Sequence, residues 1–247
     1  MKKYYTRACN FYYGVSAQSL IKKKLALPLC GNKKIAFDKL EIFTREKNKI
    51  SSKVINLKKI SHLPTLLKKK IKTDIVKITK KRKKFSETTI MGILNMTPDS
   101  FSDGGKFNTK NKAVKHVFDL LKFGADLIDI GGESTRPGSK AISKNHEWNR
   151  IKKILKILSK KVPLSLDTRK STIMKKGIKL GVKIINDVSG LEYDSETINV
   201  LKHFKTPFVL QHSQGSPKDM QNKPSYKNVL LDIYDFFERG ISQIDRS

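Results

Sequence analysis

The stretch "IMGILNMTPDSFSDGG" at residues 90–105 is the first of several apolar runs that end abruptly in polar residues. Residues 90–94 suit a buried strand, and Asn95 then begins a loop rich in Thr, Pro, Asp, Ser and Gly, which are turn-forming residues. Similar apolar runs follow at 125–132, 162–168, 182–190 and 207–215. The repetition predicts five strands, each of which opens into a polar loop.

Segments with helical periodicity alternate with these runs, at 111–124, 147–160, 171–181, 195–205 and 226–244. In the second segment the apolar residues at 151, 154, 155 and 158 form the stripe of an amphipathic helix. The chain therefore contains five consecutive β-α units. Because the strand runs are almost continuously apolar, we expect parallel strands that are covered on both faces.

Two architectures fit this pattern, a doubly wound open sheet and a (β/α)₈ barrel. The loop after the first strand lacks the GxGxxG sequence that a dinucleotide-binding sheet would carry there. Every predicted strand instead ends in polar residues, which a barrel would gather on one face, where the active sites of barrels are built. The sequence favours an α/β fold of the TIM-barrel type, with the first five of eight β-α units present.

Residues 1–88 form a separate, basic N-terminal region of unknown role, followed by the barrel-type domain at 89–247. Within that region, residues 24–46 contain two apolar runs around a Gly-Asn turn, which predicts a hairpin. The segment 80–89 is expected to be a charged linker.

The net charge of +30 raises the question of nucleic acid binding. Residues 1–89 contain 25 Lys and Arg against 5 Asp and Glu. However, only 8 of the 52 basic residues are Arg, and no aromatic residues are interleaved with the lysine runs to form a stacking surface. We therefore interpret the lysines as a solvated surface and do not expect a nucleic acid partner.

The two cysteines, Cys9 and Cys30, lack the spacing of a zinc site or a disulfide framework. No apolar stretch approaches the roughly 20 residues that a membrane span needs, and the N-terminus lacks the apolar core of a signal peptide. These features predict a soluble, cytoplasmic protein without a membrane partner.

The polar residues at the strand ends indicate which ligands could bind there. Amides and carboxylates (Asn95, Asp129, Asp167, Asn186) suit the edge of a flat nitrogen heterocycle, because a carboxylate accepts two hydrogen bonds while an amide both donates and accepts. Arg136, beside Ser134 and Thr135, suits a phosphate or a carboxylate. An Asn carbonyl together with phosphate oxygens can complete the shell of Mg²⁺. No Ser-His-Asp or Cys-His arrangement is evident, so covalent catalysis is not expected.

Four strings, "MGILNMTPDSFSDGG", "IDIGGESTRPGS", "SLDTRK" and "IINDVSG", occur in this order at the strand ends. Together they closely resemble the dihydropteroate synthases, transferases of folate biosynthesis within the pterin-binding barrel family. The resemblance covers about residues 89–247, and "QHSQGSPKDMQ" is a looser fifth match, in which the family usually has Met on both sides of the residue that is His212 here.

The resemblance implies that the protein condenses 7,8-dihydropterin-6-ylmethyl diphosphate with p-aminobenzoate, giving 7,8-dihydropteroate and diphosphate. It implies that Asn95 holds Mg²⁺, that Thr135 contacts the pterin diphosphate, and that Asp167 and Asn186 bind the pterin ring. It further implies that four loop residues close over the departing diphosphate and form the p-aminobenzoate site, which is the target of sulfonamides. These are Phe101, Asp103, Arg136 and Pro137, of which Asp103 and Arg136 are the expected catalytic residues.

Simpler interpretations of these residues stay open. Asn95 could be a turn former, Asp167 and Asn186 could cap the helices that follow them, and Arg136 could be an exposed loop cation. Asp129 could bind the ligand or orient its neighbours. His212 is expected to be structural rather than a catalytic base.

The resemblance also has a boundary. The family's later motifs, an Asp-Pro-Gly-Gly-type loop, a Ser-Arg-Lys loop and an Arg-Val-His ending, are not in this sequence, so we expect the chain alone to show no turnover. The homodimer of the full-length family is correspondingly uncertain here. Alternatives are a pterin-binding methyltransferase-type barrel, which would not need the 97–105 and 134–139 loops, and a non-catalytic paralogue or inactive fragment.

Overall fold

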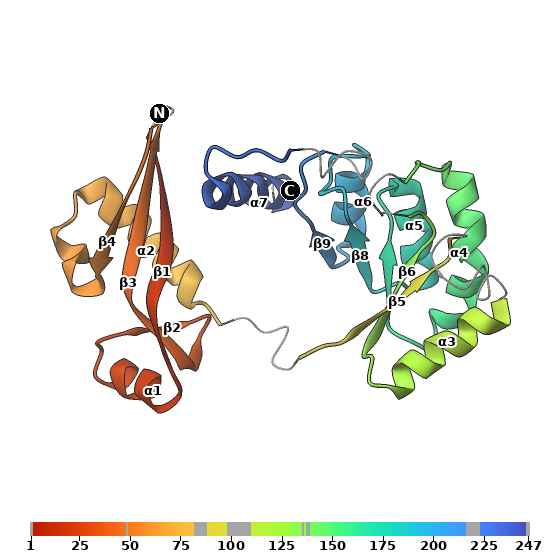
Figure 1. Ribbon diagram of the computed structural model, residues 1–247, viewed down its shortest axis with the longest axis horizontal. Coiled ribbons are helices and arrows are strands. Elements are labelled where there is room, and N and C mark those ends of the chain that lie inside the picture. The colour runs from red at the N-terminus through yellow and green to blue at the C-terminus, as the bar shows by residue number, and fades with distance from the viewer. Residues whose placement is uncertain are drawn as a thin grey trace. The chain divides into compact units, whose positions relative to one another are not determined.

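The computed structural model describes residues 2–47, 49–81, 88–97, 110–134, 136, 139–215 and 223–245. The chain divides into two compact units, Met1–Glu87 and Thr88–Ser247, and each is described here by itself (Figure 1). The division lies one residue from the boundary that the sequence indicates.

The first unit is built on a four-stranded antiparallel sheet. Its strands are β1 (Lys2–Tyr13), β2 (Leu27–Leu29), β3 (Asn32–Glu46) and β4 (Lys49–Asn56). The long strand β3 pairs with each of the other three. The hairpin predicted around the Gly-Asn turn is confirmed as β2 and β3.

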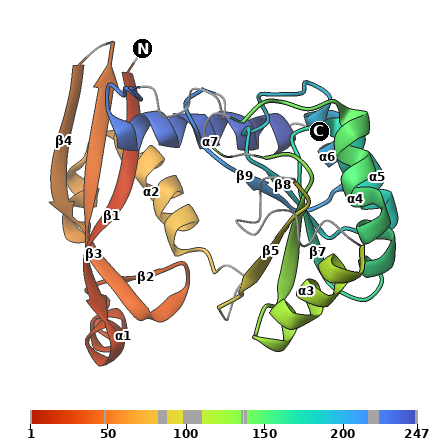
Figure 2. The same cartoon turned by 45° about the vertical axis from the view of Figure 1, so that its right-hand side comes forward.

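Helices complete the first unit: α1 (Gly14–Lys22), the 3₁₀ helix η1 (Leu57–His62) and α2 (Thr65–Thr79). Helix α2 lies along one face of the sheet (Figure 2), where Leu67 and Ile71 join a buried cluster with Phe37, Leu40 and Ile42. This core of its own explains how a region rich in lysine holds a compact fold.

The second unit contains five parallel strands: β5 (Met91–Asn95), β6 (Leu127–Gly131), β7 (Leu164–Asp167), β8 (Ile184–Asp187) and β9 (Phe208–Leu210). They pair in chain order, β5-β6-β7-β8-β9, without the reversal that defines a doubly wound sheet. The succession is that of a barrel, and the five predicted strands are confirmed.

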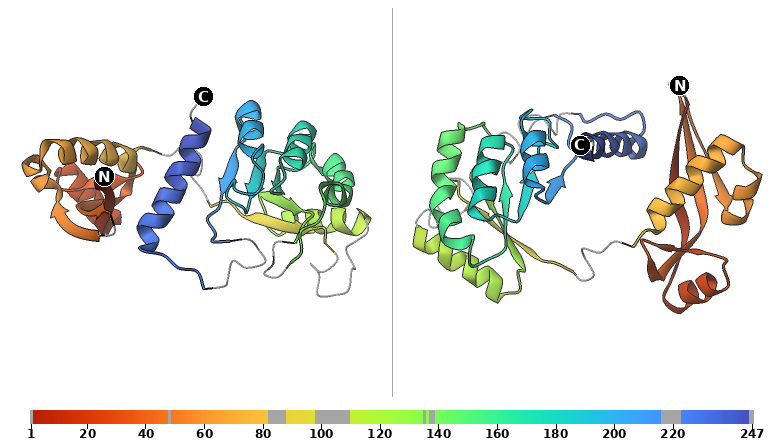
Figure 3. Two further views of the ribbon diagram at one scale, coloured as in Figure 1. Left: turned by 90° about the horizontal axis from the view of Figure 1, so that it is seen from above. Right: turned by 180° about the vertical axis from the view of Figure 1, so that it is seen from behind.

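A helix follows each strand: α3 (Lys110–Lys122), α4 (Lys144–Leu158), α5 (Ser171–Leu180), α6 (Thr197–Phe204) and α7 (Val229–Asp245). Helices α3 to α6 stand side by side along one face of the sheet (Figure 3). Ile128, Ile130 and Leu166 of the strands pack there with Ile151 and Leu155 of α4 in one buried core.

The opposite face of this sheet differs from the sequence expectation of cover on both faces. In the part of the chain that the structure describes, Met91, Ile93 and Val209 are 38%, 61% and 39% exposed on that face. The runs that read as continuously apolar alternate in the structure: one set of residues enters the helix-packed core, and the other set contains the polar residues of the strand ends. Among the described residues, the expected cover on both faces is therefore met by β6 and most of β7, and it is not met at the edge strands β5 and β9.

Candidate active site

Four residues form a row across the carboxyl ends of four strands. The strand pairing matches Asn95 with Gly131, Gly131 with Asp167, and Asp167 with Asn186. Residues paired in a parallel ladder share one pleat direction, so these side chains leave the same face, and three strand spacings separate the ends of the row by about 14 Å. Asn95, Asp167 and Asn186 are half-buried, so they line a surface that a ligand can reach.

Gly131 provides the space in the middle of the row. A Cβ atom at this position would lie 3.0 Å from Asn95 Oδ1 and 3.3 Å from Asp167 Oδ2. The two side-chain oxygens therefore face the same point above the Gly131 backbone. A larger residue would fill the space between them.

Asp129 orients one member of the row. Its Oδ2 atom accepts a hydrogen bond of 2.9 Å from Asn186 Nδ2, which fixes the direction of the Asn186 amide. Of the two interpretations that the sequence left open, the structure supports the orienting role for Asp129.

The electrostatics of the row are dominated by Asp167. Burial raises the pKa of this carboxyl group to about 8, and the negative charges of Asp129, Glu147, Asp187 and Glu133 add to the rise. Burial also raises the pKa of Asp129, against the effect of its hydrogen bond with Asn186. At neutral pH the Asp167 side chain is therefore mostly protonated until a partner with N–H donors or positive charge approaches.

Asp187 follows Asn186 in sequence but has a structural task. Its carboxylate accepts hydrogen bonds from Ser189 N, Ser189 Oγ and Leu191 N at 2.8, 2.6 and 3.1 Å. These bonds shape the loop after β8, which turns at Gly190 with a φ of 65°. Asp187 is fully buried away from the row.

Sequence reasoning left Arg169 and Lys170 without a role, and the structure places both in what we call the buried ionic cluster, formed with Glu133 and Glu147. Arg169 Nε donates to Glu133 Oε2 at 2.9 Å. Lys170 Nζ lies 3.0 Å from Glu133 Oε2 and 2.5 Å from Glu147 Oε2. The sequence signal for this cluster was the adjacent pair Arg169 and Lys170 at the end of a predicted buried strand. Charged residues at such a position are seldom buried unless they are paired.

The loop after β6 carries Arg136, whose side chain is exposed. Its described part is held by local bonds: Ser139 N donates to Arg136 O at 3.0 Å, and Ser139 Oγ donates to Ser134 O at 2.7 Å. The other expected loop residues, Phe101, Asp103, Thr135 and Pro137, lie outside the described residues.

His212 is a packing residue, as expected. Its ring meets Phe236 edge-on with centroids 4.6 Å apart, and Nε2 lies 3.1 Å from the Tyr226 hydroxyl oxygen. These contacts connect the end of β9 with helix α7.

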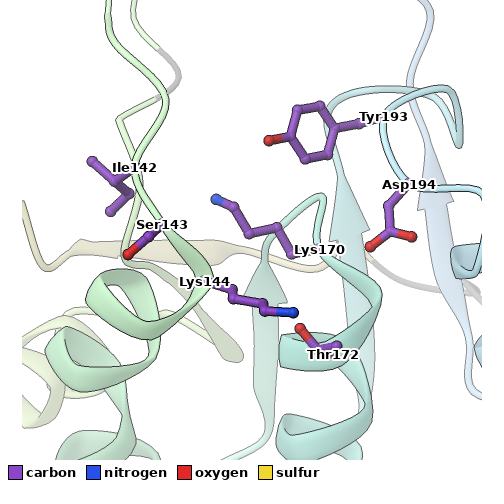
Figure 4. A pocket seen from close by; sticks show the side chains of 7 residues that line it. All are labelled: Ile142, Ser143, Lys144, Lys170, Thr172, Tyr193 and Asp194. Carbon is purple, nitrogen blue, oxygen red and sulfur yellow. The ribbon is translucent and has the colours of Figure 1, made fainter.

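A pocket of about 260 Å³ lies beside the buried ionic cluster rather than on the row. Figure 4 shows Ser143 and Lys144 at the start of α4, Thr172 in the first turn of α5, and Tyr193 and Asp194 from the loop after β8 around it. Asn95, Asp167 and Asn186 do not line it. Asp194 is already engaged at the start of α5, because Ser171 N donates to its Oδ2 at 2.9 Å.

The described residues contain no cluster of three or more His, Cys, Asp or Glu side chains placed to hold a metal ion. Among the described helices, none is long and apolar enough to cross a membrane.

Comparisons with known proteins agree with this arrangement. The model of the family described as "Pterin binding enzyme" matches residues 91–247. A dihydropteroate synthase of Synechocystis is 38% identical over 156 residues, which cover 62% of this chain and 54% of that protein. The chain thus spans about half the length of the curated relatives that it matches.

Two solved structures show the same likeness. The Yersinia pestis dihydropteroate synthase with a sulfonamide drug complex is 39% identical, with a TM-score of 0.60 over 66% of this chain and 59% of that one. The Xanthomonas albilineans dihydropteroate synthase with 4-aminobenzoic acid is 37% identical, with a TM-score of 0.58 over 65% of this chain and 57% of that one.

Proposed function

Because the chain belongs to the pterin-binding enzyme family, we propose that it carries the dihydropterin diphosphate site of a dihydropteroate synthase. The reaction joins the amine of p-aminobenzoate to the methylene carbon of 7,8-dihydropterin-6-ylmethyl diphosphate. The new C–N bond replaces the C–O bond to the diphosphate, which leaves, and the amine loses a proton. The observation that carries the proposal is the row formed by Asn95, Asp167 and Asn186 across neighbouring strand ends.

Asp167 and Asn186 are proposed to bind the pterin ring. A ring edge that donates N–H groups suits the Asp167 carboxylate, and binding would then release the proton that the raised pKa retains. The Asn186 side chain donates one N–H to Asp129, and its side-chain carbonyl and second N–H are proposed to bind the ligand. This fixed direction lowers the entropy that binding would otherwise cost.

The oxygen of Asn95 is proposed to hold Mg²⁺ on the diphosphate. Mg²⁺ usually keeps several waters and binds through one or two protein oxygens plus substrate phosphates, so a single Asn oxygen beside a diphosphate suits it. When bound, the ion would neutralise charge on the leaving diphosphate.

Loop residues complete the proposal. Arg136, on the loop after β6, would neutralise negative charge on the departing diphosphate. As the family resemblance implies, Thr135 is proposed to contact the pterin diphosphate. Phe101, Asp103 and Pro137 are proposed to act with Arg136, with the amine substrate or a sulfonamide bound among them. A cytoplasmic location and a homodimer of the complete enzyme remain part of the proposal.

The test is calorimetric titration of the chain with dihydropterin diphosphate in the presence of Mg²⁺. We expect saturable binding that weakens at least tenfold in each of Asn95→Ala, Asp167→Ala and Asn186→Ala. Asn199→Ala is the matched control, because Asn199 lies on helix α6 and its side chain donates to Glu196 Oε2 at 3.1 Å. Equal affinity in the three row variants and the control would refute the proposal, and product formation would be measured separately.

A further inference from the structure

The buried ionic cluster joins the loops that surround the row. The carboxylate of Glu133 is its centre: Oε1 accepts a hydrogen bond of 2.8 Å from Ile142 N, and Oε2 accepts one of 2.9 Å from Arg169 Nε. Glu133 and Ile142 are the two ends of the loop after β6. A single side chain therefore closes this loop and ties it to the loop after β7.

Arg169 extends the connection to a third loop. Its guanidinium carbon lies 4.0 Å from the centroid of the Tyr193 ring, which belongs to the loop after β8. The side chains of Arg169 and Glu133 are only 11% and 6% exposed, so their ion pair is shielded from water, whereas Tyr193 is 46% exposed. A shielded ion pair holds its neighbours more firmly than an exposed pair does, and the ring contact adds to this attachment.

Lys170 has a different task in the same cluster. It lies against Glu147, a fully buried residue of α4 whose other oxygen accepts a hydrogen bond of 2.6 Å from Thr168. Removal of Lys170 would leave the buried Glu147 carboxylate without a counter-charge, which destabilises the whole fold. The hydrogen bond and the ring contact of Arg169 both go to loop residues, Glu133 and Tyr193, so its substitution can change the loops while the core persists.

We propose that Arg169 is a positioning residue: through Glu133 and Ile142 it fixes the two sides of the loop after β6, so that Arg136 faces the amine substrate. The inference rests on the proposed function, because that loop carries Arg136, which is assigned to the amine and diphosphate site. Arg169 acts through Glu133 and does not itself contact the row. Its loss should therefore weaken binding of the amine more than binding of the pterin.

Arg169→Met tests this role, because Met keeps an apolar stem but loses the charge and the guanidinium plane. We would titrate two ligands into the chain: 7,8-dihydropterin without diphosphate, and p-aminobenzoate in the presence of unreactive 7,8-dihydropterin and inorganic pyrophosphate. We expect affinity for p-aminobenzoate to fall about tenfold, and affinity for 7,8-dihydropterin, which makes no contact with this loop in the proposal, to stay within twofold. Arg169→Lys, which keeps the charge, should lie between Met and the unsubstituted chain.

Lys70→Met is the matched control. It removes a cation from a half-buried pair with Asp74 in the first unit, 2.6 Å apart, and should leave both affinities unchanged. Amide hydrogen exchange at Ile142 gives a readout of the loop itself, and it should accelerate at least tenfold in Arg169→Met only, because the acceptor of that amide is released.

The outcomes separate the two proposals. Absence of dihydropterin diphosphate binding by the unsubstituted chain would overturn the proposed function. Normal pterin binding with unchanged p-aminobenzoate affinity in Arg169→Met would overturn the positioning role alone. An equal fall in both affinities would also overturn it, because it would show general damage to the fold rather than an effect on one loop.

Discussion

Asp167 is the residue whose surroundings decide the chemistry of the row. Its pKa of about 8 means that the free site holds a proton at neutral pH. If the pterin ring donates N–H groups to the carboxylate, binding must expel this proton. Affinity for a 7,8-dihydropterin without diphosphate should then rise about tenfold per pH unit from about pH 6 and level off above pH 8.

Titration in two buffers of different ionisation enthalpy measures this coupling, since the released proton adds a buffer-dependent heat. Asp167→Asn serves as the control that lacks the titrating group. Affinity that is independent of pH between 6 and 8 in the unsubstituted chain would show that the carboxylate is not the group that the ring recognises.

The same pKa shift predicts a gain in stability when Asp167 is neutralised. An unfolded Asp has a pKa near 3.9, so between about pH 4 and pH 8 the folded state binds more protons than the unfolded state, and stability falls as pH rises through this window. Asp167→Asn removes this cost and should raise the melting temperature by roughly 5 °C at pH 8, with little change at pH 4.

Asp187→Asn is the matched comparison one strand away. This substitution should lower the melting temperature. The carboxylate now accepts hydrogen bonds from Ser189 N and Leu191 N, and the Asn amide would place its own N–H donors against one of these backbone donors. Thermal denaturation followed by circular dichroism measures both variants. A lower melting temperature for Asp167→Asn at pH 8 would contradict the raised pKa assigned to the Asp167 carboxyl.

At this scale the sequence predicted the row well and the buried ionic cluster poorly. Asn95, Asp167 and Asn186 stand directly after apolar runs, and strand-end position is a local signal that a parallel sheet converts into proximity. The pairing of Arg169 with Glu133 spans 36 residues and depends on the course of two loops, which no local pattern encodes. The tasks of Asp129 and Asp187 likewise depended on which side of the strand each faced.

At the scale of elements, the pairing of β5, β6 and β7 makes Gly131 a spacer. Gly131→Ala should weaken Mg²⁺-dependent binding of dihydropterin diphosphate at least tenfold, because the new methyl group would press on Asn95 Oδ1 and Asp167 Oδ2. Titration with and without Mg²⁺ measures the effect. Asn199→Ala, on α6, is the control for a substitution elsewhere in the same unit. Unchanged affinity in Gly131→Ala would show that the two oxygens do not share a ligand.

The strands of the second unit were the most predictable elements, because long apolar runs bounded by turn residues have few alternatives. The expected cover on both faces holds for β6 and most of β7, where Asp129 and Ser165 are buried. It fails at the edge strands β5 and β9, where Met91, Ile93 and Val209 are exposed. In the first unit only the β2-β3 hairpin was visible. The other elements were hidden because lysines interrupt the apolar periodicity of α2 and β4.

At the scale of the whole molecule, the two units have separate cores and separate sheets. The row and the buried ionic cluster lie entirely in the second unit. We therefore predict that residues 88–247, expressed alone, bind dihydropterin diphosphate within threefold of the affinity of the full chain. Calorimetric titration of the two forms makes the comparison. A loss of binding in the shorter form, with its circular dichroism spectrum intact, would assign part of the site to the first unit.

A crystal structure of the chain with dihydropterin diphosphate and Mg²⁺ would show whether the row of strand-end side chains binds the pterin diphosphate. We expect the ring against Asp167 and Asn186, with the diphosphate and the metal ion at Asn95. A ligand bound instead in the pocket between Lys144 and Tyr193, with the row unoccupied, would refute this assignment.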